Sequence, residues 1–242
     1  MGAELANYYE QEFGQRYREK NKGADSDAKR IIANLSEDTV AHQFYFIEDN
    51  PNPLGEKENM DRNEQDRSRY GELHERLHPV VRNYLRYFGY YDIFLADLET
   101  GTIVYSVFKE LDFSTSLIDG PYADTNFGEV FRTAAAMLGK DEYAIVDYRN
   151  YAPSYEDPAS FIASPVFDGE RKIGVAMFQM PIERLNHIMG ERAGMGETGE
   201  SYLVGPDSLM RSDSHRDPER RSVVASFHDP ANGKVETEPA KA

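Results

Sequence analysis

The chain has 242 residues, of which 43 are acidic and 27 are basic, so its formal net charge is -16 at pH 7. It contains no Cys and no Trp, and 40% of its residues are hydrophobic, enough for a sizeable core. The negative charge opposes binding to nucleic acid, because neutralising phosphates requires a basic surface and no Lys/Arg block occurs. The lack of Cys excludes disulfides, zinc ribbons and thiol chemistry.

The sequence contains no run of about 18 apolar residues, which is the length that a membrane-spanning helix needs. Its first residues also lack the basic-then-apolar pattern of a secretory signal. We therefore expect neither feature within the sequence given.

The first 88 residues have the spacing of helices. An apolar residue at every fourth position predicts a first helix with one packing face, formed by Leu5, Tyr9, Phe13 and Tyr17. Two shorter helical pieces follow, hinged around Ser36 as an N-cap. Steps of three and four from Tyr70 to Phe88 predict a long third helix, which Pro79 is expected to kink or restart.

After Gly89 the apolar period changes to two, which is typical of strands. The sequence predicts an α+β fold in which an antiparallel sheet is packed with the long N-terminal helices. The predicted elements are strands at 91–97 and 102–108, a helix at 126–138, and strands at 143–148, 161–167 and 171–180. A helix at 182–192 is expected next, and then a short hairpin over 201–212 that opens a second, incomplete sheet.

Several motifs together resemble the double Cache (PAS-like) extracytoplasmic sensor domain of bacterial methyl-accepting chemotaxis receptors and related membrane receptors. They are FGYYDIFL at 88–95, VYSVFKELD at 104–112, TSL before GPY at 115–122, and MGETGESYLVG at 195–205. The resemblance is strongest from Phe88 to Ser214, and it is specific as a set rather than in any one motif.

The resemblance implies a membrane-distal module that binds a small polar solute, and a second module leading toward the membrane. It divides the chain into a helical segment at 1–88, a membrane-distal Cache module at 89–193, and a connector with the truncated start of the second module at 194–242. It implies a periplasmic part of an inner-membrane protein, attached through transmembrane helices that this sequence lacks. Two copies are expected to pair through their N-terminal helices, and the domain itself is expected to have no enzymatic activity and no cofactor.

Two segments correspond to the walls of the pocket in such sensors. Tyr rings supply apolar walls with hydroxyls, Arg or Lys binds a carboxylate, and Asp accepts from an ammonium or a sugar hydroxyl. The expected ligand-binding residues are Lys109, Asp112, Tyr122, Asp147, Tyr148, Arg149, Tyr151 and Tyr155. Amino-acid sensors of the family also use a Trp, which is absent here, so the ligand class stays open among organic acids, amino acids and similar metabolites.

One motif favours a different class. His74-Glu75-Arg76-Leu77-His78 matches HExxH, in which two His bind zinc and the Glu serves as general base. Pro79 follows directly, and the longer metzincin pattern fails at Val81 and Tyr84. A zinc metallopeptidase is the first alternative to a sensor, and a noncatalytic periplasmic adaptor that binds a protein is the second.

Overall fold

A computed structural model of the chain describes residues 1–235 and forms two compact units. Unit 1 consists of Met1–Asp147 and Ser160–Gln179, and unit 2 consists of Tyr148–Ala159 with the described residues from Met180 onward. Unit 1 thus joins the predicted helical segment to most of the predicted Cache module. The end of the predicted third segment, residues 236–242, lies outside the described residues. The division into three segments at 1–88, 89–193 and 194–242 remains a prediction.

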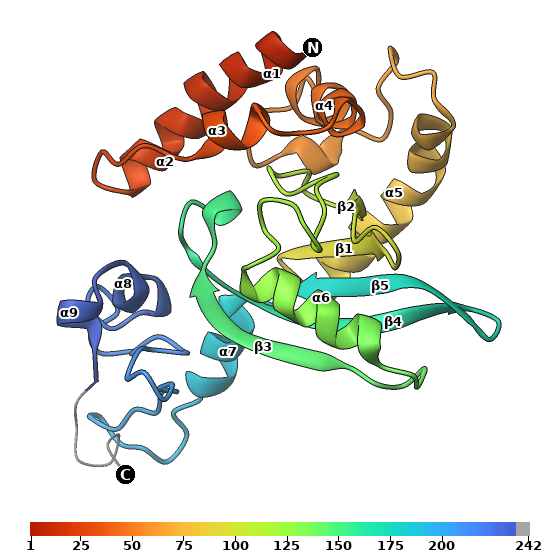
Figure 1. The fold of residues 1–242 in the computed structure, drawn as a ribbon. Helices are drawn as coiled ribbons and strands as arrows, with labels where there is room; N and C mark the ends of the chain where they lie inside the picture. The colour runs from red at the N-terminus through yellow and green to blue at the C-terminus, as the bar shows by residue number, and fades with distance from the viewer. Residues whose placement is uncertain (236–242) are drawn as a thin grey trace. The chain divides into compact units, whose positions relative to one another are not determined.

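The N-terminal part of unit 1 is helical (Figure 1). Its elements are α1 (Gly2–Tyr8), the π-helical turn η1 (Tyr9–Phe13), α2 (Gly14–Lys20), α3 (Ala28–Ile32), α4 (Glu37–Gln43), the π-helical turn η2 (Phe44–Glu48), the 3-10 turn η3 (Lys57–Asn59) and α5 (Arg69–Phe88). All four residues of the predicted first packing face are buried. The backbone N–H of Thr39 donates to Ser36 Oγ over 3.1 Å, which confirms Ser36 as the N-cap of α4.

The third predicted helix is α5, and it is a single helix of 20 residues. It begins at the N-cap Ser68, whose Oγ accepts from the N–H of Gly71 over 3.1 Å, and it ends at Gly89 in the left-handed conformation. The expected restart at Pro79 does not occur. Pro79 removes only one backbone hydrogen bond. The helix continues because the buried side chains of His78 and Leu85 hold it on both sides of Pro79.

The five predicted strands form one antiparallel sheet of order β2-β1-β5-β4-β3, which confirms the α+β class and is consistent with a PAS-like fold (Figure 1). The strands are β1 (Asp92–Asp97), β2 (Ile103–Ser106), β3 (Ala144–Asn150), β4 (Pro158–Asp168) and β5 (Arg171–Gln179). In the register, Phe94 lies opposite Ser106 of β2 and Met177 of β5.

Helices of unit 1 cover both faces of this sheet. Helix α6 (Asn126–Ala136) lies on one face, where the ring of Phe127 is 4.7 Å from that of Phe94 and stacks 4.4 Å from that of Phe161. On the other face, Leu85 of α5 packs with Ile93, the strand neighbour of Phe94. The expectation that a long N-terminal helix covers the remaining sheet face is therefore confirmed.

Unit 2 contains short helices around a small core of its own. They are the 3-10 turn η4 (Ala152–Ser154), α7 (Ile182–Met189), α8 (Val223–His228) and α9 (Pro230–Gly233). The core comprises Tyr148, Leu209, Val223 and Phe227. The predicted hairpin over 201–212 is reduced to one bridge between Val204 and Met210. The spacing of Val223 and Phe227, four residues apart, is the signal for α8 that the charged composition of this tail conceals.

We expect Phe127→Ala to lower the free energy of unfolding by about 3 to 5 kcal/mol, because it removes a buried ring that joins α6 to the sheet. Urea denaturation followed by circular dichroism measures this loss. The matched control is Leu138→Ala, because Leu138 is 87% exposed and its loss should change stability by about 0.5 kcal/mol or less. Equal effects of the two substitutions would contradict the described core.

Candidate functional site

Asp92 lies buried at the start of β1 and fixes the end of β2. Its Oδ1 accepts three backbone hydrogen bonds, from Ile93 N at 2.6 Å, Val107 N at 2.9 Å and Phe108 N at 3.2 Å. Its Oδ2 has no hydrogen-bond partner among the described residues. Burial, assisted by the charge of Asp112, raises the pKa of Asp92 to about 8. Burial thus favours the protonated form of this carboxyl group.

Lys109 places a second ionisable group inside unit 1. Its backbone is left-handed, with φ of 58°, and its N–H donates to Ser106 Oγ over 3.1 Å. The Nζ atom donates to the carbonyl of Ser106 and lies 4.4 Å from the ring centre of Tyr105 and 5.1 Å from that of Phe113. Burial lowers the pKa of Lys109 to about 7, and the nearby carboxylate of Asp92 opposes this shift.

Asp112 and Tyr122, two further predicted ligand residues, are also buried in unit 1. The carbonyl of Asp112 accepts from the N–H and the hydroxyl of Thr115, at 3.0 and 2.7 Å, which fixes the turn. Burial raises the pKa of Glu110, and the charge of Asp112 raises it further. Asp92, Lys109 and Asp112 together are called the charged core cluster below.

The two histidines of the HExxH match form a stacked neutral pair beside Tyr105. Their ring centres are 4.3 Å apart, and burial lowers the pKa of His74 to about 2 and of His78 to about 3. His78 Nε2 lies 2.7 Å from the carbonyl of Glu58 and so carries the proton, while its Nδ1, at 2.8 Å, accepts from the hydroxyl of Tyr105.

This geometry does not fit a zinc peptidase. Both nitrogens of His78 are used, and His74 Nδ1 is 2.9 Å from the carbonyl of Asp61. Glu75 is exposed and pairs with Arg62 over 2.6 Å, so it does not face the imidazoles as a general base would. Within residues 1–235, no group of three or more His, Asp or Glu side chains is placed to hold a metal ion.

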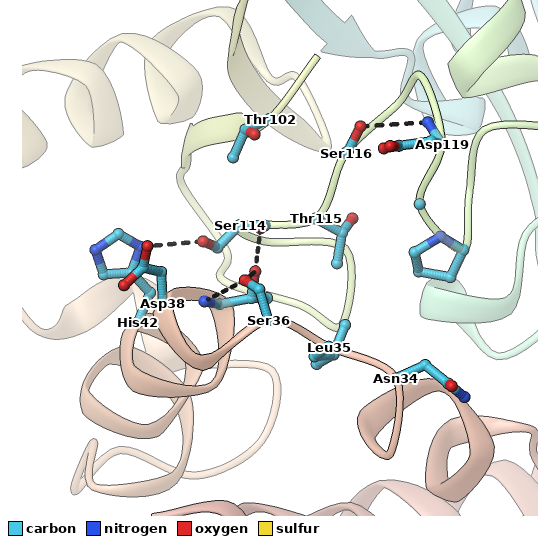
Figure 2. A pocket seen from close by; sticks show the side chains of 13 residues that line it. Asn34, Leu35, Ser36, Asp38, His42, Thr102, Ser114, Thr115, Ser116 and Asp119 are labelled. Atoms are coloured by element: carbon cyan, nitrogen blue, oxygen red, sulfur yellow. Dashed lines mark hydrogen bonds between the residues drawn. The ribbon is translucent and has the colours of Figure 1, made fainter. Parts of the chain in front are cut away.

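A pocket of about 530 Å³ opens on unit 1 between α4 and the segment after β2 (Figure 2). Hydrogen bonds join its two walls, from Thr39 Oγ1 to the carbonyl of Ser114 at 2.9 Å and between His42 Nδ1 and Ser114 Oγ at 3.0 Å. The walls also carry the exposed carboxylates of Asp38 and Asp119, and no Lys or Arg. Most hydroxyl groups that line the pocket form hydrogen bonds with one another or with the backbone. These hydrogen bonds mainly stabilise the contact of α4 with the segment after β2.

The remaining predicted ligand residues lie on β3 and in the turn that follows it. Asp147, in unit 1, is exposed, and its carbonyl accepts from Asn126 Nδ2 over 2.9 Å. In unit 2, Arg149 is exposed and Tyr151 is completely buried at the entry to η4. Tyr148 belongs to the core of this unit, and Tyr155 is buried in a left-handed conformation with φ of 59°.

In unit 1 the structure therefore brings Lys109 and Asp112 close to Asp92, a residue that sequence reasoning missed. An Asp at the first position of an otherwise apolar strand was the available signal, since a buried charge needs compensation. The roles of all eight predicted ligand residues remain predictions.

No helix among the described residues has the length and hydrophobicity required to cross a membrane. No protein-family model matches the sequence, and no curated protein matches it.

Comparison with solved structures finds ligand-binding sensor domains of chemoreceptors and histidine kinases, the class that the sequence motifs resemble. The ligand-binding domain of the Pseudomonas fluorescens chemoreceptor CtaA, in complex with L-valine, is 14% identical with a TM-score of 0.36, over 63% of this chain and 62% of that one. The V. cholerae histidine kinase DctB sensor domain is 13% identical with a TM-score of 0.43, over 90% of this chain and 70% of that one.

The ligand-binding domain of the Pseudomonas aeruginosa PAO1 amino acid chemoreceptor PctC, in complex with GABA, is 15% identical with a TM-score of 0.43, over 96% of this chain and 83% of that one. This chain thus spans less than two thirds of the CtaA structure that binds L-valine. The three TM-scores are below 0.5, so these structures assign no role to individual residues of this chain.

We expect the neutral histidine pair to make unit 1 sensitive to acid. Because the pKa values of His74 and His78 are lowered in the folded state, the unfolded chain binds more protons below pH 6.5. The contribution of the neutral histidines to the free energy of unfolding is fully present above about pH 6.5 and is lost toward pH 3. For each histidine the loss is at most about 1.4 kcal/mol per pH unit. Urea unfolding at pH 6.5 and 4.5 should show a smaller loss in His74→Phe than in the wild type. The control His215→Phe changes an exposed histidine and should leave the loss unchanged.

We expect Asp92 to change the free energy of unfolding with pH in the opposite direction. Its folded-state pKa of about 8 exceeds the ordinary value of 3.8, so the folded protein holds the extra proton and stability falls as pH rises from about 4 to 8. Asp92→Asn keeps an acceptor for the backbone N–H groups and should reduce this fall by about 1 kcal/mol per pH unit. Parallel stability profiles of Asp92→Asn and wild type would contradict the shifted pKa. Asp168→Asn, at an exposed position, is the control.

Proposed function

We propose that this chain is the ligand-sensing part of the extracytoplasmic region of a membrane receptor of the chemoreceptor type. It binds a small polar solute, such as an organic acid or an amino acid, and does no chemistry on it. The resemblance of the 88–214 motifs supports the receptor class, and the PAS-like sheet is the fold that such a sensor requires.

The charged core cluster is the observation that carries the proposal. Burying an ammonium group and two carboxyl groups costs free energy that apolar side chains would not cost, so proteins concentrate such groups at functional sites. Lys109 and Asp112 lie in the segment directly after β2, where the family resemblance implies one wall of the pocket, and Asp92 begins β1 beside them.

The predicted ligand residues of unit 2 carry recognition chemistry of their own. The guanidinium of Arg149 can hold a carboxylate with two parallel hydrogen bonds, and the hydroxyls of Tyr151 and Tyr155 can orient it. Without a Trp, the amino-acid pattern of the family is incomplete, so a carboxylate is the one ligand group that this set favours.

Transmission begins at Asp92. The carboxyl group holds the N–H groups of Val107 and Phe108, so the turn that contains Lys109 and Asp112 is tied directly to β1. β1 in turn begins three residues after Gly89, which ends α5. A solute that prefers one arrangement of this turn would shift the population of arrangements passed to α5.

The test is a thermal-shift screen with organic acids, amino acids, purines, sugars and zinc. One solute class should raise the melting temperature saturably, by on the order of 5 °C at a hundred times its dissociation constant. Arg149→Ala should abolish the shift. Arg171→Ala, at an exposed arginine on β5, should retain it.

Two outcomes would overturn the proposal. A shift with zinc alone that His74→Ala removes would instead assign a metal site and reopen the peptidase alternative. No shift with any solute, together with capture of a protein, would favour the adaptor.

A further inference from the structure

The pocket between α4 and the segment after β2 is a cavity that the proposed function does not use (Figure 2). Its volume of about 530 Å³ lies within the range of pockets that hold small molecules. All of its lining residues belong to unit 1, so the pocket is formed within one compact unit. None of the eight predicted ligand residues lines it.

The charge of the pocket comes from two carboxylates on different elements. Asp38 lies in the first turn of α4, Asp119 lies in the segment after β2, and both are exposed. Among the described residues, neither carboxylate forms a hydrogen bond or an ion pair, and no Lys or Arg lines the pocket. Burial lowers the pKa of His42 below 6.5, so this imidazole adds no positive charge at pH 7. The pocket is therefore negatively charged.

The hydrogen-bond donors of the wall are mostly used within the protein. The hydroxyls of Thr39, Thr115 and Ser116 each donate to a backbone carbonyl, at 2.9, 2.7 and 2.9 Å. The backbone N–H groups of Thr115 and Gly120 also donate to carbonyls, at 3.0 and 3.1 Å, and Pro121 has no N–H. The lone pairs of the carboxylates remain available. The wall thus offers a ligand many more acceptors than donors.

This polarity selects the class of ligand. A carboxylate or a phosphate would meet two negative charges and no cation, which opposes its binding. A sugar hydroxyl needs donors as well as acceptors from the wall, whereas an ammonium group has three donors and no acceptor. For a metal ion, the part of the chain that the structure describes lacks any suitable group of three or more His, Asp or Glu side chains. An organic ammonium ligand fits the wall best.

The two carboxylates favour a ligand with an ammonium group at each end. Asp38 and Asp119 belong to different walls of the pocket, as Figure 2 shows. Leu35 and Pro121 also line the pocket and supply apolar surface for a short chain of methylene groups. A ligand with one ammonium group would leave the second carboxylate unused.

We infer that this pocket binds a short aliphatic diamine, with one ammonium group at Asp38 and the other at Asp119. The inference goes beyond the proposed function, because the solute site favours a carboxylate and uses none of these residues. The net charge of -16 attracts cations to the whole chain, but attraction of that kind creates no saturable site.

Isothermal titration calorimetry of the whole chain with putrescine, a diamine with four methylene groups, tests the inference. We expect one saturable site with a dissociation constant on the order of 1 mM or lower, because the ligand is small and each exposed carboxylate contributes little alone. Butylamine has the same carbon chain and only one ammonium group, so it should bind about threefold to fivefold more weakly.

Substitution of the two carboxylates tests where the diamine binds. Asp38→Asn and Asp119→Asn each remove one charge and keep the side-chain shape, and together they should weaken putrescine binding at least about tenfold. Asp168→Asn is the matched control, since it removes an exposed charge outside the pocket and should bind like the wild type. Circular dichroism and the melting temperature show whether each variant is folded. Equal binding by the double variant and the control would overturn the inference, as would no saturable binding up to about 10 mM putrescine.

Two further arms separate this site from other sites. Arg149→Ala, which should abolish the shift caused by the proposed solute, should leave the affinity for putrescine unchanged. A loss of putrescine binding in this variant would place the diamine in the solute site and overturn the inference. Displacement of putrescine by equimolar Mg²⁺ would instead assign the pocket to a metal ion and would also overturn it.

Discussion

The carboxyl group of Asp92 is the constraint on which the rest of unit 1 depends. One oxygen holds three backbone N–H groups, and this joins the first residue of β1 to the turn that leaves β2. This arrangement requires an ionisable group to be buried. The fold places the ammonium group of Lys109 close enough to interact electrostatically with Asp92. Lys109 is in turn held by the carbonyl of Ser106 and by aromatic faces. A polar junction thus lies where the sheet meets the helices.

Around this junction the protein combines two kinds of packing. Phenylalanine rings join α6 to one face of the sheet, with Phe127 stacked on Phe161. Polar side chains fix the other side, where His78 connects η3, α5 and β2 through Glu58 and Tyr105. Aromatic stacking tolerates small displacements, whereas hydrogen bonds fix direction.

Hydrophobic periodicity predicted the elements because local burial produces it. The alternation after Gly89 gave all five strands, and the fourfold spacing of the first helix identified side chains that are indeed buried. The resemblance added the PAS-like arrangement, which periodicity alone does not contain. Helix α8 was missed because only Val223 and Phe227 mark it within a charged tail.

The site was harder to predict, because its energetics depend on contacts distant in sequence. The motif HERLH specifies two imidazoles on one helix face, but the carbonyls of Glu58 and Asp61 and the hydroxyl of Tyr105 determine what those imidazoles do. Asp92 falls within a predicted strand, and nothing in its neighbourhood along the chain indicates that its carboxyl group accepts from the N–H groups of Val107 and Phe108. The charge of Lys109 makes it a candidate in the sequence, whereas its left-handed backbone and aromatic surroundings depend on the fold.

Pro79 has a consequence for the motion of α5. Proline has no N–H to donate to the carbonyl of Glu75, so one backbone hydrogen bond is missing at the middle of this 20-residue helix. Glu75 is exposed, and water can solvate its carbonyl. Amide hydrogen exchange would then divide the helix into two cooperative halves, one anchored by His74 and the other by Leu85. A helix divided in this way can bend at one residue without unfolding at either end.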